Sequence, residues 1–136
     1  MEAYICALNV RGLIPNVYHY SVMDHELEQL DVAIPPATIV NYMCDTWVRH
    51  AALVCFLSAV VERCRWRYSF GRMYRTLLLD VGHIGQTFVL AATGLGLVAF
   101  QTAAFKDSLI ENALNLDPAR EPVLYAVGAG LPLTEA

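Results

Sequence analysis

No charged residue occurs between Ile84 and Phe105, a stretch of 22 residues in a chain of 136. A run of about 20 apolar residues is enough to cross a bilayer as a helix. Gln and Thr residues interrupt this stretch, however, and Gly94-Leu95-Gly96 is typical of a helix end followed by a new element. We therefore predict that a helix ends near Gly94 and that Leu97–Phe100 forms a buried strand. A small membrane protein, in which this stretch spans the bilayer, remains an alternative interpretation.

The chain is unusually apolar for its length. Hydrophobic residues make up 57% of it and charged residues 16%, whereas about 25% of a typical domain is charged. This much apolar surface excludes a disordered chain. A net charge of −4 with a single lysine disfavours a nucleic-acid binder. Two classes remain: a membrane protein, or a soluble protein that covers its apolar surface with a partner.

The N-terminus and the cysteines indicate a cytoplasmic protein. Met1-Glu2-Ala3-Tyr4 has no basic residue, so no signal peptide is predicted. No two cysteines form a CxxC pair, so we expect reduced thiols and no metal site. The cysteines are Cys6, Cys44, Cys55 and Cys64.

Turn residues and apolar periodicity divide the chain into strands, a helix, a strand, a long helix, a strand, a helix and a last strand. This order predicts an α+β domain with a mixed sheet. The first strands form a β-meander, and the apolar run Ala51–Val61 is a central strand buried on both faces. The helix over Leu77–Gly94 is expected to be buried on most sides. The other elements are a helix over Ile39–Trp47 capped by Thr38, a helix over Asp107–Leu114 and a strand over Val123–Val127.

One short segment concentrates the positive charge and interleaves it with aromatic residues. Three interpretations are open: a nucleic-acid-binding stripe, a solvated surface, and the edge of an active site. For the third, a cation beside a tyrosine favours the phenolate and makes it a better acid–base group near neutral pH. Arg67 and Tyr68 are neighbours of this kind. The segment contains Arg63, Arg65, Trp66, Arg67, Tyr68, Phe70, Arg72, Tyr74 and Arg75.

Spacing alone assigns no enzyme class. Asp80 and His83 are three positions apart and face the same way on a helix, which predicts a hydrogen-bonded core histidine more readily than a catalytic one. No nucleotide-binding glycine motif, nucleophile elbow or HExxH motif occurs.

Several runs, in order, resemble the signature of the SagB-type dehydrogenases, a group within the FMN-dependent nitroreductase superfamily. The first are Trp66-Arg67-Tyr68, Arg72-Met73-Tyr74-Arg75 and Leu79-Asp80-Val81-Gly82-His83. The resemblance continues through five more runs and covers about residues 2 to 130. These runs are Arg11–Tyr20, Gln86–Leu97, Ala103–Asp107, Leu114–Asp117 and Glu121–Gly128.

The resemblance implies a nitroreductase-like α+β flavoprotein, in which a long buried helix forms the interface of two protomers that bind FMN between them. Members oxidise azoline rings in peptides, with hydride passing to flavin N5, and relatives desaturate cyclic dipeptides. A Lys–Tyr pair handles the proton. Tyr68 matches the tyrosine, but Arg67 stands at the lysine position, and arginine stays protonated in proteins. Arg67 is therefore expected to assist Tyr68 or hold a carbonyl group.

The resemblance also indicates how the flavin is held. The backbone at Thr102, Ala103 and Ala104 matches the strand end that faces flavin N5. The family's N-terminal segment, with its Arg-Arg-Ser-like motif for the flavin phosphate, has no counterpart here. We expect residues 1–136 to form a single truncated nitroreductase-like domain. Phosphate contacts then come from Arg72 and Arg75, or from a second subunit or homo-oligomer.

The leading hypothesis is therefore a subunit of an FMN-dependent dehydrogenase or oxidase with a small peptide or cyclic peptide substrate. The alternative is a flavin-free structural or assembly subunit, which the missing phosphate motif and Arg67 both favour. Neither hypothesis involves a nucleic acid, a metal or a membrane.

Overall fold

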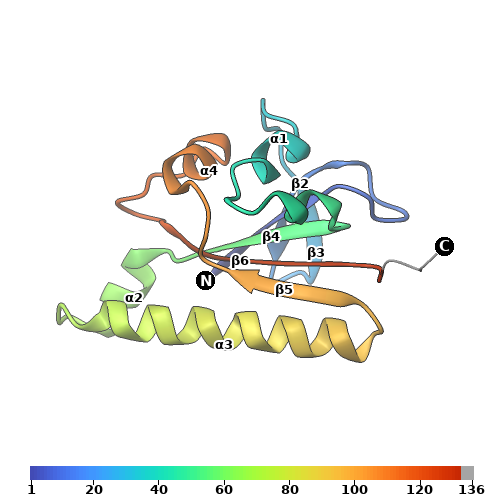
Figure 1. Ribbon diagram of the computed structural model, residues 1–136. Coiled ribbons are helices and arrows are strands. Elements are labelled where there is room, and N and C mark those ends of the chain that lie inside the picture. The colour runs from blue at the N-terminus through green and yellow to red at the C-terminus, as the bar shows by residue number, and fades with distance from the viewer. Residues whose placement is uncertain (133–136) are drawn as a thin grey trace.

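A computed structural model describes residues 1–132, so the last four residues of the expected domain 1–136 lie outside it. Residues 1–132 form six strands and four α-helices, with a short 3-10 helix between α1 and β4 (Figure 1). The first strands form the expected meander. In chain order the elements are β1 (Glu2–Ala7), β2 (Asn16–Ser21), β3 (Glu26–Gln29), α1 (Pro36–Val40), η1 (Thr46–His50), β4 (Leu53–Ser58), α2 (Val61–Arg67), α3 (Met73–Gly94), β5 (Val98–Thr102), α4 (Asp107–Ala113) and β6 (Val123–Gly130).

The strands form one sheet in the order β3-β2-β1-β4-β6-β5. Every neighbouring pair is antiparallel, so the α+β class is confirmed while the expected mixed sheet is wrong. Strands β4 and β5 do run in the same direction, as a helical crossover favours. Strand β6 inserts between them and pairs antiparallel with both, which removes the parallel neighbours.

The sheet lies between two layers of helices (Figure 1), and an apolar core lies on each of its faces. Helices α1 and α4 cover one face, and α3 lies along the other. Successive side chains of a strand point to opposite faces. Val54 and Phe56 accordingly join the core under α1 and α4, and Cys55 and Leu57 join the core under α3. The prediction that this strand is central and buried on both faces is confirmed.

Helix α3 touches the sheet with a narrow stripe. Val81, Gly85 and Ala92 are its buried residues, so the expectation of burial on most sides is wrong for the single chain. A Cβ at Gly85 would lie 2.8 Å from Gln101 Oε1 and from Tyr125 Cε1, so this position needs glycine for close approach to the sheet. Apart from this stripe α3 is largely exposed, with Leu79 and Leu90 on the side away from the sheet and Tyr74, Leu78 and Ile84 exposed elsewhere along the helix. By length and composition, α3 could also cross a membrane.

The predicted end of this helix is confirmed. Gly96 has a φ of +78°, the left-handed conformation that glycine adopts readily. The Gly96 N–H donates to Thr93 O at 3.0 Å and the Leu97 N–H to Ala92 O at 3.0 Å, which is a Schellman motif. The chain thus turns at Gly96 and enters β5.

Two local predictions differ from the structure. The helix expected over Ile39–Trp47 is divided into α1 and η1. Pro36 begins α1 early, so Thr38 lies inside the helix rather than at its cap. Residues 42–44 then pair with residues 104–106 instead of continuing the helix, with Lys106 N–H donating to Tyr42 O and Cys44 N–H to Ala104 O. The strand expected to be buried after Leu97 is β5, an edge strand that is only partly covered. Its outer edge has no strand beside it among residues 1–132, which leaves its side chains half exposed.

Candidate functional site

Helix α2 carries the arginine and tyrosine singled out in the sequence. It follows β4 directly, and the Val61 N–H donates to Arg120 O at 2.9 Å, which attaches its first residue to the segment before β6. None of its residues is buried. Tyr68 caps its C-terminus, with its N–H donating to Cys64 O at 2.8 Å and an extended backbone that ends the helix.

Tyr68 borders two hollows. The smaller, which we call the Tyr68 pocket, has a volume of about 220 Å³ and includes Arg63, Cys64, Arg67 and Asp80 in its lining. The larger, which we call the aromatic groove, has a volume of about 610 Å³. Tyr68 lines both hollows, so this residue borders each of them. The groove is lined by Glu62, Arg65, Trp66, Tyr68, Ser69, Phe70, Gly71, Met73 and Tyr74.

The predicted neighbours Arg67 and Tyr68 are in contact. The Arg67 guanidinium carbon lies over the Tyr68 ring, 5.9 Å from its centroid, which is a cation–π arrangement. Phe70 meets the same ring edge-on, with centroids 5.8 Å apart. The guanidinium thus supplies a fixed positive charge beside the phenol.

Arg72 and Arg75 lie at the start of α3, where Arg72 is the N-cap residue. Both are exposed, and neither forms an ion pair with any residue in the described part of the chain. Their positive charge is therefore available to an outside anion.

Thr102, Ala103 and Ala104 lie at the end of β5. Ala103 and Ala104 are exposed, and the side chain of each is only a methyl group. The Ala104 N–H donates to Thr102 Oγ1 at 3.0 Å, and Ala104 O accepts the Cys44 N–H at 2.9 Å. This strand end is thus an accessible backbone surface with a defined turn.

The structure does not bring the two groups of predicted site residues together within one chain. The Gln101 side chain donates to Gln86 Oε1 at 3.1 Å, so the end of β5 lies beside the middle of α3. Arg75 and Arg72 precede Gln86 by 11 and 14 residues at the start of this helix, about 16–21 Å along the axis at 1.5 Å per residue. A ligand that needs both groups would have to bridge that separation, or take them from two chains.

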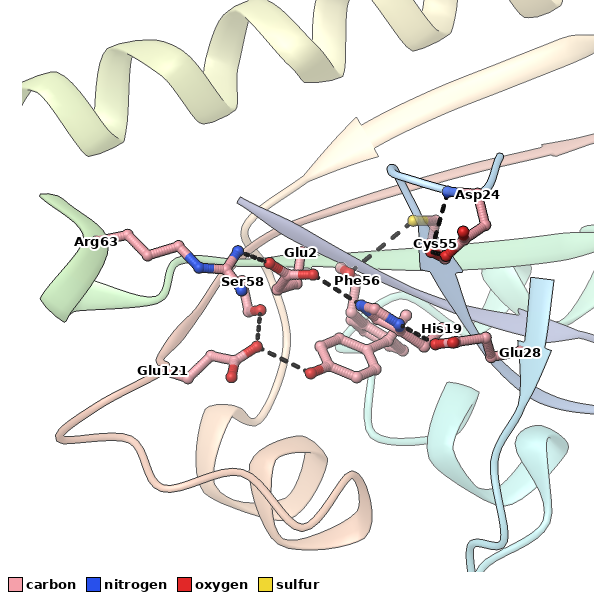
Figure 2. A network of polar contacts seen from close by, with 11 residues as sticks. Glu2, His19, Asp24, Glu28, Cys55, Phe56, Ser58, Arg63 and Glu121 are labelled. Atoms are coloured by element: carbon pink, nitrogen blue, oxygen red, sulfur yellow. Dashed lines mark hydrogen bonds and ion pairs between the residues drawn. The ribbon is translucent and has the colours of Figure 1, made fainter. Parts of the chain in front are cut away.

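A polar network that the sequence did not reveal lies between the sheet and α2 (Figure 2). We call it the Glu2 network; it consists of Glu28, His19, Glu2 and Arg63. His19 Nδ1 lies 2.9 Å from Glu28 Oε2 and His19 Nε2 lies 2.7 Å from Glu2 Oε2. Arg63 pairs with the other oxygen of Glu2. Glu2 and Arg63 are 61 positions apart, so no local sequence pattern indicated this contact.

The network shifts the titration of its members in opposite directions. Burial alone would raise the pKa of Glu2, but hydrogen bonds from His19 and Arg63 outweigh it and lower that pKa. Burial alone would lower the pKa of His19, but hydrogen bonds to Glu28 and Glu2 raise it. Both shifts favour the charged forms, and when His19 is protonated the four side chains form an alternating row of negative and positive charges.

A second group of polar side chains lies next to this network. Glu121 Oε1 accepts the Tyr4 hydroxyl at 2.9 Å and the Ser58 hydroxyl at 2.7 Å. Burial, followed by the Glu121 carboxylate, raises the pKa of Tyr4. The Tyr4 ring packs against His19, with centroids 5.4 Å apart. These contacts join β1 and the end of β4 to the loop that precedes β6.

Asp80 and His83 do not behave as expected. His83 is exposed rather than part of the core, because it lies on the outer side of α3. Asp80 is also exposed and contributes to the Tyr68 pocket. No group of three or more His, Cys, Asp or Glu side chains is placed to hold a metal ion in the range 1–132.

The sequence of this chain is similar to those of known proteins. The chain is 32% identical over 122 residues to the trifolitoxin-processing protein TfxB of Rhizobium leguminosarum bv. trifolii, covering 86% of this chain and 32% of TfxB. It is 28% identical over 117 residues to a nitroreductase-like protein of Methanocaldococcus jannaschii, covering 85% of this chain and 59% of that protein. The chain thus spans between one third and three fifths of the length of these relatives.

Solved structures show the same fold. A nitroreductase-like protein of Anabaena variabilis superimposes with a TM-score of 0.84 at 29% identity, covering 97% of this chain and 27% of that one. A subunit of the E. coli microcin synthetase McbBCD complex, with truncated pro-MccB17 bound, gives a TM-score of 0.85 at 22% identity, covering 98% and 52%. The family model for nitroreductases matches residues 2–131. The chain therefore belongs to the nitroreductase family.

Proposed function

We propose that the chain is a subunit of an FMN-dependent dehydrogenase or oxidase that acts on a peptide-derived or azoline-type natural product. The observation that carries the proposal is the position of Tyr68: a phenol under the Arg67 guanidinium, at the border of two hollows. The similarity to TfxB, which processes trifolitoxin, supports a peptide substrate.

The residues present fit FMN in two separate parts. The exposed backbone at Ala103 and Ala104 has no bulky side chain to keep a flat ring away. The guanidinium groups of Arg72 and Arg75, which form no ion pair within residues 1–132, suit a phosphate. Because these parts lie apart along α3, we infer that a second subunit, or a second copy of this chain, completes the site. The exposed apolar face of α3 is the surface that such a partner would cover.

Bound FMN would supply a hydride acceptor, and the chain's own residues would manage the proton. Tyr68 takes a proton from the substrate or returns it, and its place beside the groove lets it reach a bound peptide. Arg67 cannot be the base because it stays protonated, so it holds the phenol in place and stabilises negative charge on it. The complex works in the cytoplasm, without a membrane or nucleic acid.

A second function is favoured by one observation. Within this chain the candidate flavin-contacting backbone and the candidate phosphate-binding arginines do not meet. The chain would then be a flavin-free structural or assembly subunit that uses the nitroreductase fold to bind its partner.

Flavin content and one substitution separate these functions. The visible spectrum is recorded for the purified chain, for its complex, and for both after denaturation to release flavin. Tyr68→Phe is compared with Tyr20→Phe, a phenol on β2 that is hydrogen-bonded to His25 away from both hollows. The proposal requires flavin in the complex and a turnover loss of at least about 100-fold, typical of a lost acid–base group, for Tyr68→Phe alone. A colourless complex, or unchanged turnover in Tyr68→Phe, contradicts it.

A further inference from the structure

Helix α2 presents Tyr68 but has little packing to fix its own position. None of its residues is buried, and its first N–H is bonded to Arg120 O. Arg65 bonds to Glu62 at 2.8 Å within the same helix and so does not attach it to the sheet. The side-chain hydrogen bond between α2 and the sheet, among residues 1–132, is the one from Arg63 to Glu2.

Glu2 is itself held from both sides. One of its oxygens accepts Arg63 and the other faces His19 Nε2 at 2.7 Å. Its side chain is 11% exposed, whereas Arg63 is 67% exposed. His19 in turn is fixed by Glu28 and by the ring of Tyr4. A carboxylate whose two oxygens are both hydrogen-bonded has a single orientation. Glu2 therefore holds the Arg63 guanidinium at one place on the sheet (Figure 2).

We propose that Glu2, locked by His19, is a positioning residue that sets the place of α2 through Arg63 and thereby keeps Tyr68 at the border of the Tyr68 pocket and the aromatic groove. This inference rests on the proposed function for its effect on turnover, but its structural part does not. Arg63 precedes Arg67 by four residues, about one helical turn, so a shift at Arg63 is passed to the end of the helix.

The test compares two arginines on the same helix. Arg63 and Arg65 are 67% and 64% exposed, and each pairs with one glutamate, but Arg63 reaches the sheet and Arg65 does not. Hydrogen–deuterium exchange is measured for Glu2→Gln, Arg63→Gln and Arg65→Gln. We expect the amides of residues 64–68 to exchange about tenfold faster in the first two variants, as loss of a charge-assisted hydrogen bond implies. The control Arg65→Gln should stay within about twofold of the wild type.

Two results bear directly on the proposal. Amides of β1 and β4 should keep wild-type protection, since these strands are held by their neighbours rather than by Arg63. Equal exchange of α2 in Arg63→Gln and Arg65→Gln overturns the proposal. Because Arg63 is exposed, this comparison remains available even if Glu2→Gln does not fold.

Turnover of the flavin-loaded complex supplies the second readout. Glu2→Gln and Arg63→Gln should lower kcat about tenfold with little change in KM, and Arg63→Lys should recover part of the loss. Wild-type kcat in these variants, in a complex that Tyr68→Phe inactivates, also overturns the positioning role. If Tyr68→Phe itself leaves turnover intact, the proposed function fails, and the exchange data still decide whether Glu2 positions α2.

Discussion

The Nε2 atom of His19 lies 2.7 Å from Oε2 of Glu2, between two strands that pair directly in the sheet. This contact joins a histidine of β2 to a carboxylate that also pairs with Arg63 of α2. A pair of this kind makes stability depend on pH, because neutral His19 can donate to only one of Glu2 and Glu28, whereas protonated His19 can donate to both and carries the opposite charge.

The first prediction concerns that pH dependence. The pKa of His19 is raised above 6.5, so its contribution is fully present below about pH 6.5 and is lost as pH rises through the raised value. The pKa of Glu2 is lowered below 4.5, so its contribution is present above about pH 4.5 and is lost as pH falls through the lowered value. The charged groups facing His19 are Glu2 and Glu28, and the Tyr4 ring packs on it.

Replacement of His19 should reveal this window. We expect His19→Asn to cost about 1 kcal/mol between pH 4.5 and 6.5, and progressively less on either side. Urea unfolding of both proteins between about pH 4 and pH 9 measures it. A cost that does not vary with pH would show that the ion pair contributes nothing.

The second prediction concerns the contact of α3 with the sheet. Gly85→Ala would place a Cβ 2.8 Å from both Gln101 Oε1 and Tyr125 Cε1. Overpacking of this kind should destabilise the chain by about 1–3 kcal/mol. Gly82→Ala, one turn earlier with no atom within 4 Å of the new Cβ, should be neutral or stabilising by up to about 1 kcal/mol. Chemical denaturation of both variants gives the comparison; equal values would mean that α3 does not approach the sheet so closely.

The third prediction concerns the outer face of α3. Leu90 is 64% exposed on this face, and Met23, in the turn between β2 and β3, is 93% exposed. If a partner covers α3, Leu90→Glu should weaken association by at least about tenfold, whereas Met23→Glu should leave it unchanged. Sedimentation velocity over a range of concentrations measures this. Equal behaviour of the two variants would place the partner elsewhere.

The fourth prediction concerns the thiols. Burial raises the pKa of Cys6 and of Cys55 to about 12, so neither should react while the chain is folded. Cys44 is exposed, and its N–H donates to Ala104 O beside the end of β5. A maleimide should therefore label Cys44 first, and FMN bound at that strand end should slow the labelling. Mass spectrometry with Cys44→Ser as the control identifies the site.

Local patterns predicted much of the fold correctly. The meander, the central strand over Leu53–Ser58, the helix over Asp107–Ala113 and the turn at Gly96 follow from residue spacing and backbone preference. The long-range arrangement did not follow. Residues near the end of the chain form β6, which inserts between β4 and β5, and no local pattern specifies that insertion.

The candidate site was also only partly predictable from the sequence. Arg67 and Tyr68 are adjacent in the sequence, so their contact could be predicted, and their side chains are in contact in the structure. The relation of Thr102–Ala104 to Arg72 and Arg75 depends on how α3 lies on the sheet, and this separates the two groups. The Glu2 network, which holds α2, was not foreseen at all.

The sequence by itself determined the order of the elements, their local ends, the family resemblance and the pairing of a phenol with a permanent cation. These properties depend on neighbours along the chain, whose contacts are short in sequence. Only the tertiary structure decided that the sheet is antiparallel throughout, that α3 exposes an apolar face, and that Glu2 meets both His19 and Arg63. Those contacts join residues 17 and 61 positions apart, and their geometry exists only once the strands have paired.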